Sequence, residues 1–165
     1  MPVVSNTSPI LNLALIDRLS LIKEQFGKVS ISQAVFNELR VEENLPGSKL
    51  MKNALESGWI KVEEVHDSPI LRVLNRDLDK GEAEAIALAL ELKAELILLD
   101  EREARIAAKN LELRVTGVLG ILLRAWHQKR FPSLQHELKM LRNEAGFHIA
   151  NHLYDKILQN IKDMD

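Results

Sequence analysis

Short apolar runs alternate with amphipathic segments along most of the chain, and this alternation predicts its secondary structure. Brief apolar runs between turn-forming residues are typical of buried strands, whereas apolar residues at every third or fourth position indicate helices. The predicted strands cover residues 2–5, 29–31, 59–65, 95–99 and 113–115. The predicted helices cover residues 10–15, 19–22, 33–39, 46–57, 68–77, 81–93, 101–110, 117–129, 133–144 and 148–162.

The order of these elements favours an α/β fold. Strands that alternate with helices typically form a parallel sheet, because each parallel strand needs a crossover connection that covers one face. We therefore predict a three-layer αβα domain with a mostly parallel central sheet over residues 1–130. Two further helical segments follow without a strand between them, and we interpret residues 131–165 as an appended helical tail of the same domain.

Composition narrows the classes of function. The chain has 165 residues, enough for one domain with a sizeable core. Its 22 basic and 24 acidic residues give a formal charge of −2, so any nucleic acid would have to be bound by a local basic surface. The absence of cysteine excludes disulfides, thiolate zinc sites and cysteine nucleophiles. Without a basic leader or an apolar run near the ~20 residues that span a bilayer, we expect a cytoplasmic protein with no membrane partner.

Acidic and amide side chains occur where this fold would expose them to a ligand. Asp100 follows the apolar run 96–99, and Asn6 follows the first strand. Both therefore mark the carboxyl ends of predicted parallel strands, where ligands bind in α/β sheets. Glu82 and Glu38 share helix faces with apolar residues three or four positions away. Because a carboxylate on a buried face is costly without a cation, these positions predict a metal site.

Together these positions resemble the PIN-domain family of metal-dependent ribonucleases, which includes the VapC-type toxins. The resemblance covers about residues 2 to 125 and rests on the order and spacing of several segments. These segments are Val3–Ile10, Val29–Leu39, Asp79–Glu82 with Ala89, Leu98–Glu101 and Val115–Leu122.

The resemblance implies a site for Mg²⁺ or Mn²⁺ and the hydrolysis of RNA phosphodiester bonds. The residues that it assigns to the metal are Asn6, Glu38, Glu82 and Asp100, of which the three acids are also the catalytic residues. Thr7 and Ser8 are expected to hold water at the metal or to support its ligands, and Glu101 is an auxiliary acid. Arg102 and Arg105, together with Lys109, are expected to contact RNA phosphates.

Asn6 departs from the family's pattern, which usually has aspartate at this position. An amide oxygen can coordinate a hard cation but brings no charge, so the predicted site is weaker. Two functions therefore stay open: a metal-dependent endoribonuclease, with the toxin of a toxin–antitoxin pair as one form, and a catalytically degenerate PIN domain that acts as a binding or regulatory module. A phosphohydrolase of small nucleotides would use the same cation. Beyond RNA, the resemblance implies an antitoxin protein and a second copy of the chain as partners.

Ordinary structural roles are also open to these residues. Asp100 and Asn6 could each cap the helix that follows them. Glu38 could be an ordinary solvated residue, and Glu82 could interact favourably with the dipole of its helix. Glu84 lies two residues after Glu82, about 200° around the helix, and is expected to be solvated. His148 and His152 are expected to be structural or surface residues, since the segment between them lacks a zinc-protease glutamate.

Overall fold

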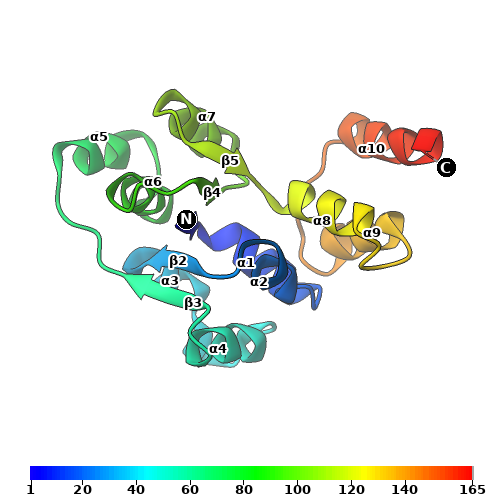
Figure 1. The fold of residues 1–165 in the computed structure, drawn as a ribbon, viewed down its shortest axis with the longest axis horizontal. Helices are drawn as coiled ribbons and strands as arrows, with labels where there is room; N and C mark the ends of the chain where they lie inside the picture. Colours follow the sequence, from blue (N-terminus) through cyan, green and yellow to red (C-terminus); the bar gives the residue numbers. More distant parts are fainter. Residues whose placement is uncertain (165) are drawn as a thin grey trace.

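Five parallel strands form the central sheet in the computed structural model, which describes residues 1–164 (Figure 1). The strands are β1 (Val3–Ser5), β2 (Val29–Ser32), β3 (Ile60–Glu63), β4 (Leu96–Leu98) and β5 (Arg114–Thr116). Their order is β3-β2-β1-β4-β5, and every neighbouring pair is parallel. This confirms the predicted sheet, with β1 and β4 paired in register at its centre.

Each predicted helix is present, with ends that differ by a few residues. The helices are α1 (Thr7–Leu15), α2 (Ser20–Phe26), α3 (Gln33–Leu39), α4 (Ser48–Glu56), α5 (Pro69–Asp77), α6 (Lys80–Glu91), α7 (Arg102–Asn110), α8 (Val118–His127), α9 (Leu134–Asn143) and α10 (Asn151–Met164). Polar caps fix several starts: the hydroxyl oxygens of Ser32 and Ser68 accept hydrogen bonds from backbone N–H groups of α3 and α5. No helix within the described residues has the length and apolar character needed to cross a bilayer.

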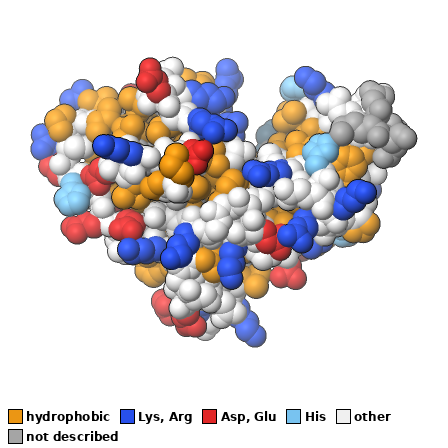
Figure 2. Space-filling view, in the orientation of Figure 1, with side chains coloured by type: hydrophobic (Ala, Val, Ile, Leu, Met, Phe, Trp, Pro, Cys, Tyr) orange, Lys and Arg blue, Asp and Glu red, His pale blue; other side chains and the backbone are white. Residues whose placement is uncertain are grey.

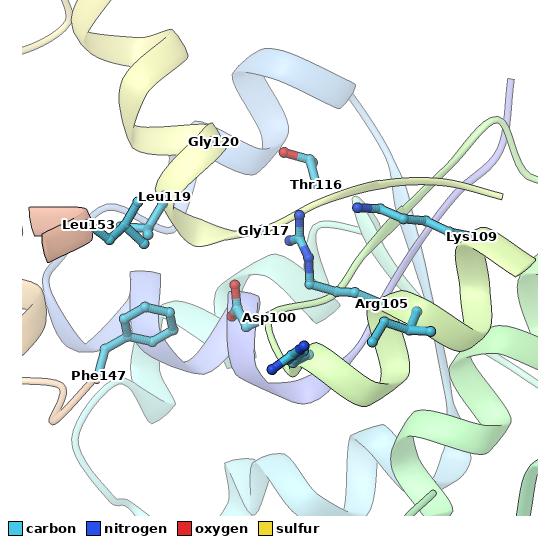
Figure 3. A pocket seen from close by; sticks show the side chains of 11 residues that line it. Asp100, Arg105, Lys109, Thr116, Gly117, Leu119, Gly120, Phe147 and Leu153 are labelled. Carbon is cyan, nitrogen blue, oxygen red and sulfur yellow. The ribbon is translucent and has the colours of Figure 1, made fainter. Parts of the chain in front are cut away.

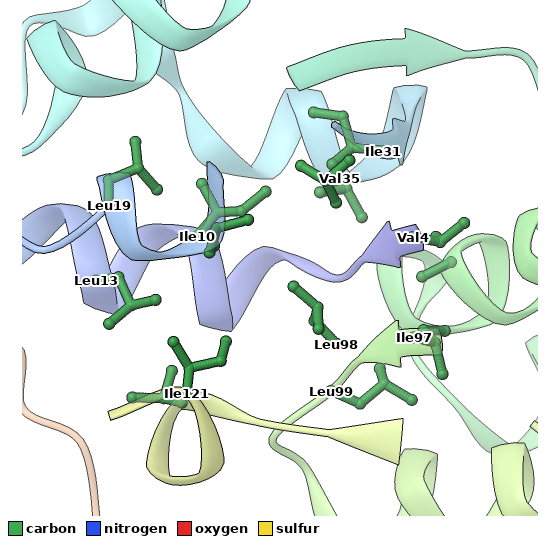
Figure 4. Close-up of a cluster of buried hydrophobic side chains, with 14 of the residues drawn as sticks. Val4, Ile10, Leu13, Leu19, Ile31, Val35, Ile97, Leu98, Leu99 and Ile121 are labelled. Carbon is green, nitrogen blue, oxygen red and sulfur yellow. The ribbon is translucent and has the colours of Figure 1, made fainter. Parts of the chain in front are cut away.

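The helices cover both faces of the sheet and complete the three-layer architecture. The apolar core between the layers draws side chains from the central strands and from α1, α3 and α8 (Figure 4). Val4, Ile31 and Ile97 are fully buried on three adjacent strands. Burial on both faces explains why the central strands β1 and β4 belong to apolar runs of the sequence.

Helix α6 lies at the centre of the packing and is enclosed on most sides. It contacts β1, β2 and β4 as well as α3 and α5. The prediction that Glu84 is solvated is therefore wrong: its side chain is half-buried, and its Oε1 accepts a hydrogen bond of 3.2 Å from the Ala34 N–H at the start of α3. The prediction assumed that a residue on the side of α6 opposite Glu82 faces solvent. Because α6 has neighbours on most of its sides, that assumption fails for Glu84.

An ion pair with one buried partner joins α9 to the segment between α1 and α2. Arg18, between α1 and α2, donates two hydrogen bonds to the carboxylate of Glu137 on α9, at 2.7 and 3.0 Å. Glu137 is only 3% exposed, and the Arg18 guanidinium also lies 5.3 Å from the centre of the Phe131 ring. This contact fixes α9 against α1 and thereby positions the segment that follows α9.

Candidate functional site

Asp100 lies just beyond β4, and three elements meet at its carboxylate. The Ser8 hydroxyl in the first turn of α1 donates to Oδ2 at 2.6 Å, and the Val118 N–H at the start of α8 donates to Oδ1 at 2.8 Å. Asp100 does not cap the following helix, since Glu101 occupies that position and makes no side-chain cap hydrogen bond. The carboxylate instead lies at the N-terminal ends of α1 and α8, where helix dipoles favour negative charge.

The surroundings of Asp100 leave little space for its carboxylate to move. Asn12 donates to the Ser8 oxygen at 2.8 Å, so the hydroxyl that holds Asp100 is itself held. At Gly117 a Cβ atom would lie 2.5 Å from Oδ1 of Asp100 and 2.9 Å from the carbonyl oxygen of Leu99. A glycine is therefore needed where the turn between β5 and α8 passes the carboxylate.

Glu38 is exposed, so the prediction that it lies on a buried helix face is wrong, but its carboxylate reaches the first turn of α1 from α3. The Thr7 hydroxyl donates a short hydrogen bond to Oε2 of Glu38, and the carboxylate lies against the backbone of Gly81 at the start of α6, where a Cβ atom would be 2.8 Å from its Cδ. The adjacent residues Thr7 and Ser8 thus bind Glu38 and Asp100. The structure brings two of the predicted acids to the first turn of α1.

The Glu82 carboxylate helps to cap the start of its own helix, α6. The Asp79 carboxylate accepts a hydrogen bond of 2.8 Å from the Glu82 N–H, and the Glu82 carboxylate accepts one of 3.3 Å from the Asp79 N–H. The sequence left open a role for Glu82 as partner of the helix dipole; the structure shows a capping box at the same helix start. The residue is nevertheless buried, at 9% exposure.

Burial raises the pKa of both Glu82 and Asp100. For Glu82, burial together with the hydrogen-bonded carboxyl group of Asp79 and the charge of Glu101 raises the pKa from 4.5 to about 7. For Asp100, burial raises the pKa, and the charge of Glu101 acts in the same direction; hydrogen bonds from Ser8 and the backbone and the charge of Arg105 oppose the shift. The charge of Glu101 thus raises the pKa of both carboxylates.

We expect Glu82→Gln to reduce the pH dependence of stability in metal-free buffer. With its pKa raised from 4.5 to about 7, Glu82 holds more protons in the folded than in the unfolded chain, so the free energy of unfolding should fall as pH rises through this range. Glutamine keeps the capping geometry without ionising. Urea denaturation in EDTA between about pH 5 and pH 8 measures the slope, and Glu56→Gln, at an exposed position of α4, is the matched control. An unchanged slope in Glu82→Gln would contradict the pKa assignment.

Asn6 does not cap the helix that it precedes. Its backbone N–H donates to the carbonyl oxygen of Leu98 at 3.0 Å, and its side chain makes no cap hydrogen bond. The residue is 4% exposed, and its Oδ1 has no hydrogen-bond partner among the described residues. A buried acceptor oxygen without a donor is costly, so a cation or an ordered water is expected to satisfy it.

The described residues do not form a complete cage for a metal ion. Among the side chains that the structure describes, no group of three or more His, Asp or Glu is arranged to hold one. Mg²⁺ often needs only one or two carboxylates, because it keeps several waters. The free oxygen of Asn6 and the carboxylate of Asp100, which follow the paired strands β1 and β4, are the groups that such an ion could use.

Two cavities meet at Asp100. The larger, of about 630 Å³, lies between α7, the start of α8 and the C-terminal segment (Figure 3). The smaller, of about 440 Å³, lies between the start of α1 and the loop that follows α9. The sequence-predicted residues on the larger cavity are Asp100, Arg102, Arg105 and Lys109; those on the smaller one are Ser8, Asp100 and Glu101.

Sequence reasoning missed the contribution of the C-terminal segment to these cavities. Phe147 lines both, His148 lines the smaller and Leu153 lines the larger. His148 is exposed, as expected of a surface residue, but it lies beside the predicted site. No spacing pattern connects these residues to the acids; the only signal is an aromatic residue in a segment without helical periodicity.

Comparisons with known proteins agree with this architecture. A family described as a PIN domain matches residues 2–163. A solved structure of a PilT N-terminus domain protein from the hyperthermophilic archaeon Sulfolobus solfataricus P2 is similar in fold, with a TM-score of 0.55 and 21% sequence identity over 76% of this chain and 93% of that chain. No curated protein matches the chain significantly. Because the family match extends over nearly the whole sequence, the chain belongs to the PIN-domain family and has its nuclease-type α/β fold.

Proposed function

We propose that this protein is a divalent-metal-dependent endoribonuclease that hydrolyses RNA phosphodiester bonds in the cleft at Asp100. The observation that carries the proposal is the position of this carboxylate. It lies at the carboxyl end of a central parallel strand, is held by the first turns of two helices, and borders a cavity lined by three cations of α7. Ligands of α/β sheets bind at such strand ends.

The donor set suits Mg²⁺ or Mn²⁺, which Asp100 and Asn6 would hold with support from Glu38 and Glu82. The buried Oδ1 of Asn6 has no partner among the described residues, and burial raises the pKa of Asp100 and Glu82. A nearby cation would be coordinated by the free oxygen of Asn6 and would offset the free-energy cost of the buried negative charge. A divalent ion there supplies a more acidic water and neutralises charge at a scissile phosphate.

The residues of the chain orient both the acids and the RNA. Thr7 and Ser8 hold Glu38 and Asp100 in place. The Arg105 guanidinium donates to the carbonyl oxygen of Leu99 at 2.9 Å, which fixes it beside the end of β4. The overall charge is only −2, so RNA would be bound by the local cations of α7. Because these cations would contact phosphates, the RNA affinity would fall as the salt concentration rises.

A catalytically degenerate binding module is the second candidate. The Glu82 carboxylate accepts a hydrogen bond from its own helix start, and Asn6 supplies no charge. A site with this donor set could bind RNA or a cation weakly without supporting hydrolysis.

Asn6→Asp separates the two candidates. We expect it to tighten Mn²⁺ binding roughly tenfold, because an anionic ligand interacts with a dication more strongly than an amide dipole does. Without metal the new carboxylate is buried and should lower the melting temperature, so Mn²⁺ should stabilise the variant more than wild type. Calorimetric titration, thermal melts and cleavage of single-stranded RNA measure these effects.

Combining Asn6→Asp with Asp100→Asn tests whether both residues act on one ion. Most of the gain in Mn²⁺ affinity should then be lost, since the two changes would couple through a shared ligand. Cleavage that rises with affinity in Asn6→Asp supports the enzyme. If wild type and Asn6→Asp bind Mn²⁺ and neither cleaves RNA, the binding module is correct; if neither binds metal nor RNA, both proposals are wrong.

A further inference from the structure

Phe147 lies in the wall that separates the two cavities at Asp100. Its segment joins α9 to α10 and is held by a hydrogen bond of 3.1 Å from the Phe147 N–H to the carbonyl oxygen of Leu141. The preceding Gly146 has a φ of +68°, a conformation that glycine adopts readily, and this turns the chain toward the cleft. Figure 3 shows the Phe147 ring directed toward Asp100.

The two sides of this ring differ in charge. The larger cavity carries Arg102, Arg105 and Lys109, whereas the smaller one carries Glu101 and His148 next to Asp100. Neither Arg102 nor Lys109 forms an ion pair with another residue of the described chain. Figure 2 shows Lys and Arg side chains gathered over α7, beside the hollow that separates this helix from the C-terminal helices.

An aromatic ring beside unpaired cations matches the chemistry of a single nucleotide unit. Its phosphate carries negative charge, and its base presents a flat apolar face. The volume of about 630 Å³ is within the range of small-ligand sites. Leu119 and Leu153 line the same cavity as the ring and add to its apolar surface. An apolar peptide would use the ring and the leucines but would leave Arg102 and Lys109 without an ion-pair partner.

We propose that Phe147 is the base-stacking residue of this site, so that the C-terminal segment supplies the platform for the nucleobase adjoining the phosphate at Asp100. The proposal rests on the proposed function, because it takes RNA as the substrate. Arg102 and Lys109 contact the phosphates that lead into the cleft. The C-terminal segment then determines which bases are accepted beside the scissile bond, through the strength of their stacking on the ring.

Substitutions at Phe147 test the stacking without removing the side chain's packing. Phe147→Leu keeps an apolar side chain but lacks an aromatic face, whereas Phe147→Tyr keeps the face. The probe is a short single-stranded RNA that carries one 2-aminopurine, titrated in EDTA so that binding is measured without cleavage. We expect affinity about 5- to 100-fold lower for Phe147→Leu, close to wild type for Phe147→Tyr, and 2-aminopurine quenching lost only in the leucine variant.

Two controls separate stacking from effects on the fold. Phe36→Leu removes a half-buried aromatic of α3 that lines neither cavity, and it should leave RNA affinity unchanged. An RNA with an abasic site in place of the 2-aminopurine should bind wild type and Phe147→Leu equally, since it has no base to stack. Thermal melts of all variants show whether the C-terminal segment stays folded.

The outcomes distinguish this inference from the proposed function. If wild type cleaves RNA in Mn²⁺ and Phe147→Leu binds and cleaves as wild type does, the stacking role is wrong and the enzyme stands. If binding depends on the aromatic face but no variant cleaves, stacking stands and the enzyme is wrong. If the leucine and tyrosine variants lose affinity equally, the ring acts by packing alone and the inference is overturned. Absence of any RNA binding, or binding of an apolar peptide in its place, overturns both.

Discussion

Replacing Asp100 with asparagine is expected to lower the rate of RNA cleavage by about a hundredfold or more while the protein stays folded. The carboxamide oxygen can still accept the Val118 N–H, and the amide can donate to the Ser8 hydroxyl, so the hydrogen bonds at the start of α1 and α8 are kept. What is lost is the negative charge that a divalent cation needs at the end of β4.

The measurement compares cleavage of a single-stranded RNA at fixed Mn²⁺ with thermal melts of the same samples. Asp77→Asn is the matched control. It removes a carboxylate from an exposed position of α5 that lines a different pocket from the two at Asp100. Wild-type cleavage by Asp100→Asn would show that hydrolysis takes place elsewhere. A large loss of melting temperature would instead indicate a structural role for the charge.

The second large effect is expected at the ion pair between Arg18 and Glu137. Arg18→Ala should lower the free energy of unfolding by about 2–3 kcal/mol, because Glu137 would keep a buried charge without its partner. The value is below that of a fully buried pair, since the Arg18 side chain is 36% exposed and partly screened by water.

Urea denaturation at neutral pH measures this loss, and a surface pair gives the control. Arg72 and Asp67 form a comparable contact of 2.8 Å with side chains that are 69% and 70% exposed. Arg72→Ala should therefore lower the free energy of unfolding much less than Arg18→Ala does. Equal losses in the two variants would mean that burial does not determine the strength of the Arg18 contact.

The elements of the fold could be predicted from sequence because burial leaves a local pattern. The central strands β1 and β4 are covered on both faces, so they appear as apolar runs, and cap residues such as Ser32 and Ser68 mark where helices begin. The short 3₁₀ helix at Val41–Glu43 was not predicted, since a single turn leaves no periodicity to detect.

The contacts of individual side chains were harder to predict than the elements that carry them. Asp100 was placed correctly at a strand end, but its partner Val118 is 18 residues away and depends on the return of the chain through β5. Glu84 was assigned to solvent, although α3 packs against the same helix and offers it a backbone N–H. Phe147 follows α9, which packs against α1 and α8, and no local pattern encodes that packing.

The central position of β1 has a consequence for how the protein is made. The strand pairs with β2 on one side and with β4 on the other, and the hydrogen bond from Ser8 to Asp100 joins residues 92 positions apart. Contacts of such long sequence separation slow folding and leave strand edges open on the growing polypeptide. During synthesis, one edge of β1 therefore stays unpaired until β4 leaves the ribosome, and the carboxylate of Asp100 has its full set of partners only after Val118 follows.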